Sequence, residues 1–194
     1  MKCLFPAIFL FGLASSAAGA ADFSPFGALV AEPPQGAKPP FEIRLGGFAH
    51  DPQSPESGSA DFNTELLFGD LIPSSPDSMW KILMLRPHIG ATVNFAGKTS
   101  NLYAGLTGTV YVYRGLFLEA SFGGAANDGK AGEFVPPGHN AMGCNVSFHE
   151  NASIGYRLSE SWSLMGTIEH FSNEGLCVRN RGLTNYGVRV GYAF

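Results

Sequence analysis

His170 and Ser172 are separated by a single residue near the end of the chain. If this segment is an extended strand, the two side chains project from the same face, about 7 Å apart along the strand. An imidazole and a hydroxyl can lean across that gap to form a hydrogen bond, which is the minimum for a general base that activates a serine. The pair therefore suggests nucleophilic catalysis, although the same two residue types also occur together by chance.

The face that carries this pair is otherwise apolar. Trp162, Leu164 and Ile168 precede His170 and Ser172 at alternating positions. Such a run is typical of a strand with one face against lipid. Polar side chains on an otherwise apolar face need an explanation. Catalysis at a lipid surface is one such explanation.

The beginning of the chain indicates export. A short positive start is followed by an apolar core at 4–13 and by small residues at 18–20, so residues 1–20 are expected to be a signal peptide. Residues 21–40 are rich in proline and are expected to form an irregular N-terminal arm. Residues 41–194 remain for one folded domain.

Composition excludes several classes of protein. The formal net charge is −4, which gives no reason to expect a nucleic-acid partner. No run after the signal peptide approaches the roughly 20 apolar residues of a membrane helix. The remaining histidines show no ligand spacing with cysteines or carboxylates, so neither a metal nor another cofactor is expected. These histidines are His50, His88, His139 and His149.

Two cysteines remain after removal of the signal peptide, Cys144 and Cys177. In an exported protein a single disulfide between them is the default expectation, with two free thiols as the alternative. Both lie in predicted loops next to the His170 strand. A bridge would therefore tie together the two loops that flank the candidate site.

Eight segments alternate between apolar and mainly polar residues, as β-strands with two different faces do. Together with the signal peptide and the terminal Phe194, this pattern predicts an all-β fold, an eight-stranded antiparallel transmembrane β-barrel of the bacterial outer membrane. The alternative is a soluble sandwich or lipocalin-like barrel, since alternation alone does not tell inside from outside. The expected strands are 41–46, 62–68, 85–95, 102–112, 116–122, 148–158, 162–172 and 184–194.

The polar faces carry charges of both signs. In a membrane barrel these side chains would point inward and form a buried network instead of lining an open pore. They are Glu42, Arg44, Glu65, Arg86, His88, Glu119, Arg157, Glu169 and Arg189.

A family resemblance rests on the segment His170-Phe171-Ser172-Asn173-Glu174-Gly175-Leu176, followed by Asn180-Arg181-Gly182-Leu183. It resembles the signature of the outer-membrane lipid A 3-O-deacylases, the PagL family. The close match covers about the last 25 residues of the chain. The resemblance implies hydrolysis of the ester-linked 3-hydroxyacyl chain at position 3 of lipid A. It also implies that His170 is the general base, Ser172 the nucleophile and Asn173 a contributor to the oxyanion hole.

One position departs from this signature. The family's acid lies two residues after the glycine of Asn-x-Gly, and here that residue is Thr184, which carries no charge. If the turn at 159–161 has three residues, Glu150 lies directly opposite His170 on the preceding strand. We therefore expect Glu150 to be the orienting acid. Glu174 in the loop is an alternative, and a dyad without any acid is another.

The sequence thus predicts a serine esterase of lipid A in the bacterial outer membrane. Two alternatives stay open: a noncatalytic small barrel with a structural or adhesive role, and an acyltransferase that passes the acyl group to an acceptor other than water. The expected partners are lipopolysaccharide and the membrane itself. A homodimer is a further option that the sequence leaves open.

Overall fold

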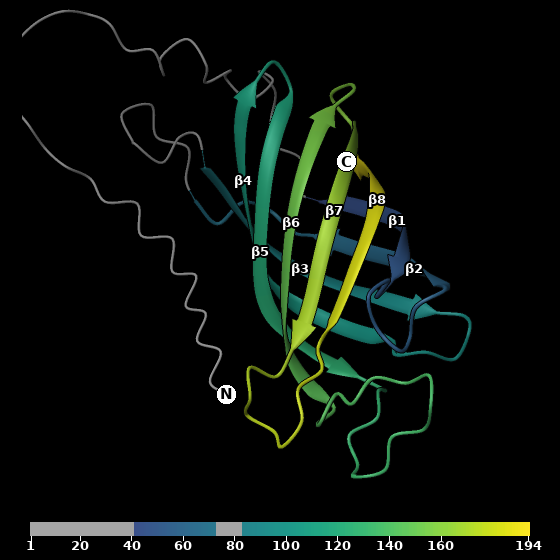
Figure 1. Cartoon of the computed structure of the whole chain (residues 1–194). Coiled ribbons are helices and arrows are strands. Elements are labelled where there is room, and N and C mark those ends of the chain that lie inside the picture. Colours follow the sequence, from purple (N-terminus) through teal and green to yellow (C-terminus); the bar gives the residue numbers. More distant parts are fainter. Residues whose placement is uncertain (1–40, 73–82) are drawn as a thin grey trace, which may run out of the picture.

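The computed structural model describes residues 41–72 and 83–194. Its eight antiparallel strands form a closed barrel, so the predicted fold class is confirmed (Figure 1). The expected signal peptide and N-terminal arm, and most of the residues between the predicted strands 62–68 and 85–95, lie outside the described residues. The strands are β1 Glu42–His50, β2 Ser59–Leu67, β3 Leu83–Asn94, β4 Asn101–Tyr113, β5 Leu116–Asn127, β6 Val146–Arg157, β7 Trp162–Ser172 and β8 Leu183–Ala193.

Each strand pairs with its neighbours in sequence, and β8 pairs with β1 to close the barrel. The turns set the registers. Arg114 and Gly115 both have positive φ values, 38° and 90°, as a two-residue hairpin turn between twisted strands requires. Between β6 and β7, the amide of Leu158 donates to the carbonyl of Trp162, which leaves the predicted three-residue turn.

Three strands extend by three or more residues beyond an end that the sequence predicts. β1 continues beyond Gly46, β2 begins at Ser59, and β5 continues through Gly123 and Gly124. The glycines interrupt the alternation of side chains but not the backbone pairing. At Gly123, a Cβ atom would overlap the carbonyl oxygen of Ala104 on β4, so the close strand pairing there requires glycine.

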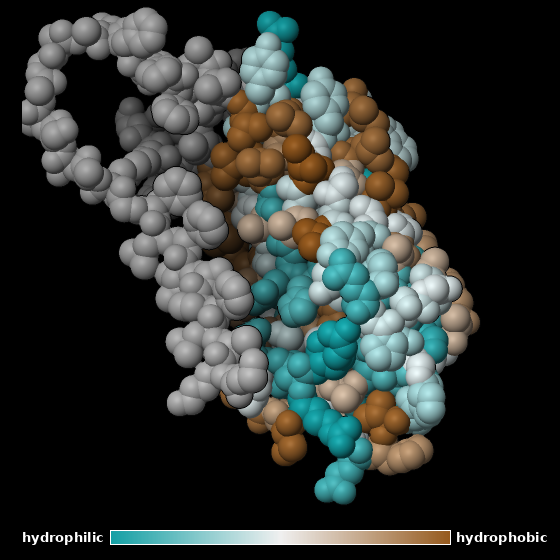
Figure 2. All heavy atoms as spheres, in the orientation of Figure 1, coloured by the Kyte–Doolittle hydropathy of each residue, from teal (hydrophilic) through white to brown (hydrophobic). Residues whose placement is uncertain are grey.

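The outer wall of the barrel is apolar. Leucine, isoleucine, valine and aromatic side chains alternate outward on every strand, as Leu102 and Ile154 do with 58% and 57% of their surfaces exposed. On the face shown in Figure 2, hydrophobic side chains gather toward the end that carries the C-terminus. Such a wall suits the hydrocarbon region of a bilayer. In the described part of the chain no helix is long and apolar enough to span a membrane.

The interior holds the charges that the sequence places there. Arg44 donates to Glu42, Glu65 and Glu119, and Arg189 donates to Glu169. Removing one member of such a buried network would leave an unpaired charge, so the network favours a single arrangement of strands. These interior charges are engaged with one another, and the candidate catalytic residues lie instead on the outer wall and in the loops.

Candidate active site

The candidate site lies at the end of the barrel where β7 ends, which we call the loop end. Ser172 is the last residue of β7, and the loops after β5 and β7 extend from this end, opposite the C-terminus (Figure 1). His170 is half-buried on the outer wall. It lies between Glu150 of β6 and Thr184 of β8 in the register of the sheet. The predicted register between β6 and β7 is therefore confirmed.

A residue of β8 holds the imidazole of His170 in place. Its Nδ1 atom lies 2.8 Å from the hydroxyl oxygen of Thr184, within hydrogen-bond distance. Thr184 thus occupies the position next to Nδ1 at which a triad would place its acid. Nε2, the nitrogen that would receive a serine proton, has no hydrogen-bond partner among the described residues.

Ser172 is covered by the loop that follows it. Only 4% of its surface is exposed, and its hydroxyl donates to Oε1 of Glu174 at 2.7 Å. Glu174 has a positive φ of 50°, which returns its side chain toward the serine. In the described residues no hydrogen bond joins Ser172 to His170. Such bonds are commonly absent or long before substrate binds.

Glu150 is exposed on the outer wall, opposite His170. In the described part of the chain it makes no hydrogen bond or ion pair. Nδ1 of His170 faces Thr184 on β8 and not Glu150 on β6. The role of Glu150 as the orienting acid therefore stays a prediction.

Asn173 organises the loop. Its Nδ2 atom donates to the carbonyls of Met142 and Arg179, both at 2.7 Å, while its Oδ1 accepts from the amide of Gly175 at 3.0 Å. Gly175 has φ +81°, a conformation that strongly favours glycine. Both hydrogens of the Asn173 side-chain amide are therefore engaged in the loop and not held free for an oxyanion.

Asn180 belongs to the motif quoted above, but the sequence does not predict which group it contacts. Its Oδ1 accepts the backbone amide of Asn173 at 2.9 Å, and its own side-chain nitrogen has no partner in the described residues. The motif marks Asn180 as a residue of interest, but its hydrogen bond to Asn173 depends on how the loop folds back. Asn180 therefore helps to hold the loop beside Ser172.

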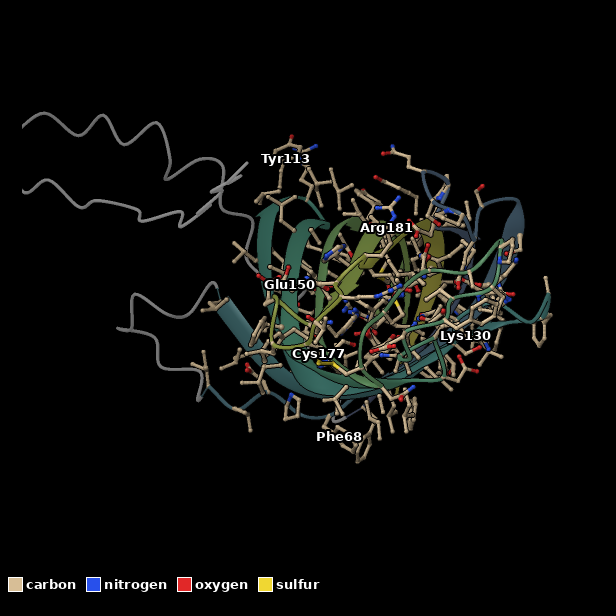
Figure 3. The ribbon with its side chains drawn as sticks, turned by 60° about the horizontal axis from the view of Figure 1, so that its bottom comes forward. Phe68, Tyr113, Lys130, Glu150, Cys177 and Arg181 are labelled. Carbon is tan, nitrogen blue, oxygen red and sulfur yellow. A yellow bond between two sulfur atoms is a disulfide. The ribbon has the colours of Figure 1, made fainter. Side chains whose placement is uncertain are left out.

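A disulfide joins Cys144 to Cys177, with 6.1 Å between their Cα atoms. It connects the loop after β5 to the loop after β7, as the positions in sequence suggest. Figure 3 looks toward the loop end and shows this bridge at Cys177, on the same side of the barrel as Glu150. The bond from Asn173 to Met142 crosses between the same two loops.

An apolar groove of about 380 Å³ lies on the outer wall next to this loop. Its walls are apolar side chains from β5, β6 and the loop, and the rings of Phe122 and Phe148 stack 5.8 Å apart. Gly123 and Gly124 leave its floor without side chains. Asn173 also lines the groove, and Phe148 in its wall is paired with Ser172, so the groove lies next to the strand position of the serine.

The other loops form a polar cap over the loop end. Its centre is Glu56, which is fully buried and accepts hydrogen bonds from the backbone amides of Thr99 and Asn140. Burial raises the pKa of Glu56, but the hydrogen bonds from His50, Asn140 and Thr99 outweigh it and lower the pKa to about 2. The cap thus holds a charged carboxylate near the site.

Asp51 is a second residue that the sequence does not single out. It follows β1 directly, and its Oδ1 accepts the backbone amide of Thr184 at 3.2 Å. No motif marks it, because its place depends on the pairing of β1 with β8. Among the described residues no group of three or more histidine, cysteine or acidic side chains could hold a metal ion.

Comparisons with known proteins support the barrel fold. The family model described as lipid A 3-O-deacylase (PagL) matches residues 80–193, more than half of the chain. The crystal structure of the outer membrane enzyme PagL is similar, with a TM-score of 0.64 and 18% identity over 79% of this chain and 99% of that one. A de novo designed transmembrane β-barrel has a TM-score of 0.52 and 14% identity, over 81% of this chain and 98% of its own.

No curated protein sequence matches the chain. The family match includes β7, β8 and the loop between them, and so covers every residue of the His170 motif. The fold and the family together place the protein in the bacterial outer membrane. The chain belongs to the PagL family of lipid A 3-O-deacylases.

Proposed function

We propose that this protein hydrolyses the ester-linked 3-hydroxyacyl chain at position 3 of lipid A, with Ser172 as nucleophile and His170 as general base. One observation carries the proposal. The two residues lie at the end of one strand, beside an apolar groove on the lipid-facing wall. The ester of a membrane lipid would meet such a site without leaving the bilayer.

The reaction begins when the Ser172 hydroxyl leaves Glu174 and turns to Nε2 of His170. Nε2 takes the hydroxyl proton while the serine oxygen attacks the ester carbonyl. The tetrahedral intermediate collapses, and the position-3 oxygen of lipid A leaves with the proton from Nε2. Water then attacks the acyl-serine, gives a proton to Nε2 and releases the 3-hydroxy fatty acid as Ser172 recovers its proton.

Thr184 is proposed to set the tautomer of His170. When Nδ1–H donates to the threonine hydroxyl, Nε2 is left as the acceptor that the serine proton requires. A hydroxyl orients the ring but adds no negative charge to stabilise an imidazolium. The threonine therefore performs one of the two roles of a triad acid.

Glu150 and Asn173 stay in the proposed site with limited roles. A turn of the imidazole by 180° would bring Nδ1 to the side of Glu150, which would then be the orienting acid. Asn173 could contribute to the oxyanion hole if substrate opens one of its two carbonyl bonds. Until then it shapes the loop against which the oxyanion would form.

The groove is proposed to hold the acyl chain that is cut off. Its walls are apolar, and Phe148 in its wall is paired with Ser172, so a chain lying in it would bring its ester close to the nucleophile. The site is built by one chain, and a homodimer is not needed to complete it.

Mass spectrometry of lipid A tests the proposal. Purified protein in vesicles that contain lipid A should release a 3-hydroxy fatty acid and leave lipid A lighter by that group. Ser172→Ala and His170→Ala should each abolish release while the barrel still resists heat in detergent. Ser163→Ala, which changes an inward serine at the other end of β7, is the matched control.

The same spectra separate the alternatives. An acyltransferase would leave lipid A lighter but transfer the mass to an acceptor instead of releasing a free acid. A noncatalytic barrel would leave lipid A unchanged. Full activity in Ser172→Ala would overturn the proposed mechanism.

A further inference from the structure

Asp51 is a buried carboxylate beside the candidate site. Only 6% of its surface is exposed. Oδ1 accepts the backbone amide of Thr184 at 3.2 Å, and Oδ2 accepts Nδ2 of Asn140 at 2.6 Å. Its own amide donates to Asn185 at 3.0 Å. Hydrogen bonds with Thr184, Asn140 and Asn185 thus fix its position.

No cation neutralises this carboxylate in the described part of the chain. A buried carboxylate without a counter-charge is costly unless hydrogen bonds replace the lost water, as those from Thr184 and Asn140 do here. The backbone of Asp51 also lies in the left-handed region, with φ +33°. Non-glycine residues in this region are often found at functional sites, where the surrounding structure holds them.

The position of Asp51 follows from the sheet. β1 and β8 pair with Ala49 opposite Tyr186. Just beyond this pairing the carboxylate of Asp51 accepts the amide of Thr184, which lies opposite His170 on β7. The two hydrogen bonds share Thr184: its hydroxyl contacts Nδ1 of His170, and its amide contacts Asp51. The carboxylate is therefore one residue away from the imidazole, on the side of Nδ1.

Asn140 makes a second connection from Asp51 to the histidine. Its Nδ2 atom also donates to the carbonyl of Gly182 at 3.3 Å. Gly182 has φ +68°, and a Cβ atom there would lie 3.1 Å from Cε1 of His170. The cluster around Asp51 thus reaches the imidazole along two lines, through Thr184 and through Gly182.

We propose that Asp51 is a positioning residue that supplies, from behind Thr184, the negative charge that the PagL signature places at residue 184. Thr184 holds the ring by its hydroxyl, and Asp51 stabilises the imidazolium across one residue. The two together replace a single carboxylate. This inference rests on the proposed function of His170, but its physical claim concerns the histidine alone.

Other charged groups also face His170. Glu150 lies opposite it on β6, and Glu174 reaches back to Ser172 from the loop. Arg181 lies before β8 and donates to the carbonyl of Gln53, close to Asp51 in sequence. To show that Asp51 supplies the stabilising charge, a variant of Asp51 must therefore be compared with a variant of Glu150.

The experiment uses the full chain in detergent with lipid A and compares Asp51→Asn with the wild type. The substitution keeps the size of the side chain but removes its charge. Turnover should fall about tenfold or more. The acid limb of the pH–rate profile should move to lower pH, because the imidazolium loses a stabilising charge. By NMR, the titration midpoint of the His170 ring should move the same way.

Rescue gives the second arm. Asp51→Asn combined with Thr184→Glu puts a carboxylate next to Nδ1 and should restore turnover and move the acid limb back. Asp128→Asn is the matched control, because that carboxylate also accepts a backbone amide, from Ser100, but lies in another loop. Glu150→Gln should leave the His170 midpoint closer to wild type than Asp51→Asn does.

Two results would overturn the inference: an unchanged midpoint in Asp51→Asn, or a loss of turnover that neither moves the acid limb nor responds to Thr184→Glu. If Asp51→Asn does not fold, the exchange Asp51→Asn with Asn140→Asp restores a donor and an acceptor between these side chains, and the same readouts apply. A wild-type protein that releases no fatty acid would refute the proposed function, while the NMR midpoint would still decide the role of Asp51.

Discussion

The hydroxyl oxygen of Thr184 lies 2.8 Å from Nδ1 of His170, across the pair of strands β7 and β8. Thr184 therefore makes a contact expected of a catalytic acid without the charge of one. The contact is directional, and it leaves Nε2 free for the serine.

Thr184→Val should lower turnover by about tenfold or more, because it keeps the shape of the side chain but removes the acceptor that fixes the tautomer. Thr184→Ser keeps the hydroxyl and should stay close to wild type. The measurement is kcat for release of 3-hydroxy fatty acid by both variants. Equal kcat in the valine and serine variants would show that the hydroxyl does not orient the ring.

Glu150→Gln should retain turnover within about threefold, because Glu150 has no hydrogen bond in the described structure and faces the exposed outer wall. The measurement is again kcat, with Asp51→Asn assayed beside it. A loss of orders of magnitude in Glu150→Gln alone would mean that the imidazole turns toward β6 in the active enzyme. The acid would then be Glu150, as the sequence suggests.

Much of this geometry can be predicted from the sequence. The alternation of residues gives the strands, and the length of the turn at 159–161 gives the pairing of Glu150 with His170, which the structure confirms. The orientation of the imidazole is different. It depends on which neighbouring strand offers a partner to Nδ1, and Thr184 becomes that partner only once β7 and β8 are paired.

The residues that the sequence misses lie in loops or beyond the ends of strands. Asp51 and Asn140 lie in loops that are far apart in the sequence, and neither belongs to a periodic pattern or a motif. Gly123 and Gly124 are paired in β5, although without side chains they look like the start of a loop. Contacts of this kind depend on closure of the barrel, so local pattern does not reveal them.

The cap over the loop end should keep its structure to low pH. Because the pKa of Glu56 is lowered to about 2 in the folded protein, its contribution is present above its ordinary value near 4.5 and is lost as the pH falls toward 2. Hydrogen exchange of the Thr99 and Asn140 amides, corrected for intrinsic rates, should accelerate in that window. The Leu176 amide, which donates to the carbonyl of Asn173, is the internal control.

Glu56→Gln removes the titrating group and should remove the pH dependence of both amides. Protection of Thr99 and Asn140 should then be weaker at neutral pH, because a neutral amide oxygen is a poorer acceptor than a carboxylate. If both amides stay fully protected in this variant, the carboxylate of Glu56 does not hold the cap together.

Gly124→Leu should change the choice of acyl chain without changing the chemistry. Gly124 lies on the floor of the groove, and a Cβ atom added there meets nothing within 4 Å, so the side chain fits but occupies space for the substrate. We expect kcat/KM for long 3-hydroxyacyl chains to fall by about tenfold or more, with a smaller loss for short ones.

The matched control is Gly166→Leu. Gly166 also faces outward with open space around it, on β7, but does not line the groove. Lipid A species with 3-hydroxyacyl chains of different lengths should be assayed with both variants. Equal losses for all lengths in Gly124→Leu would mean that the groove does not hold the acyl chain. A change of chain preference in Gly166→Leu would place the chain along β7 instead.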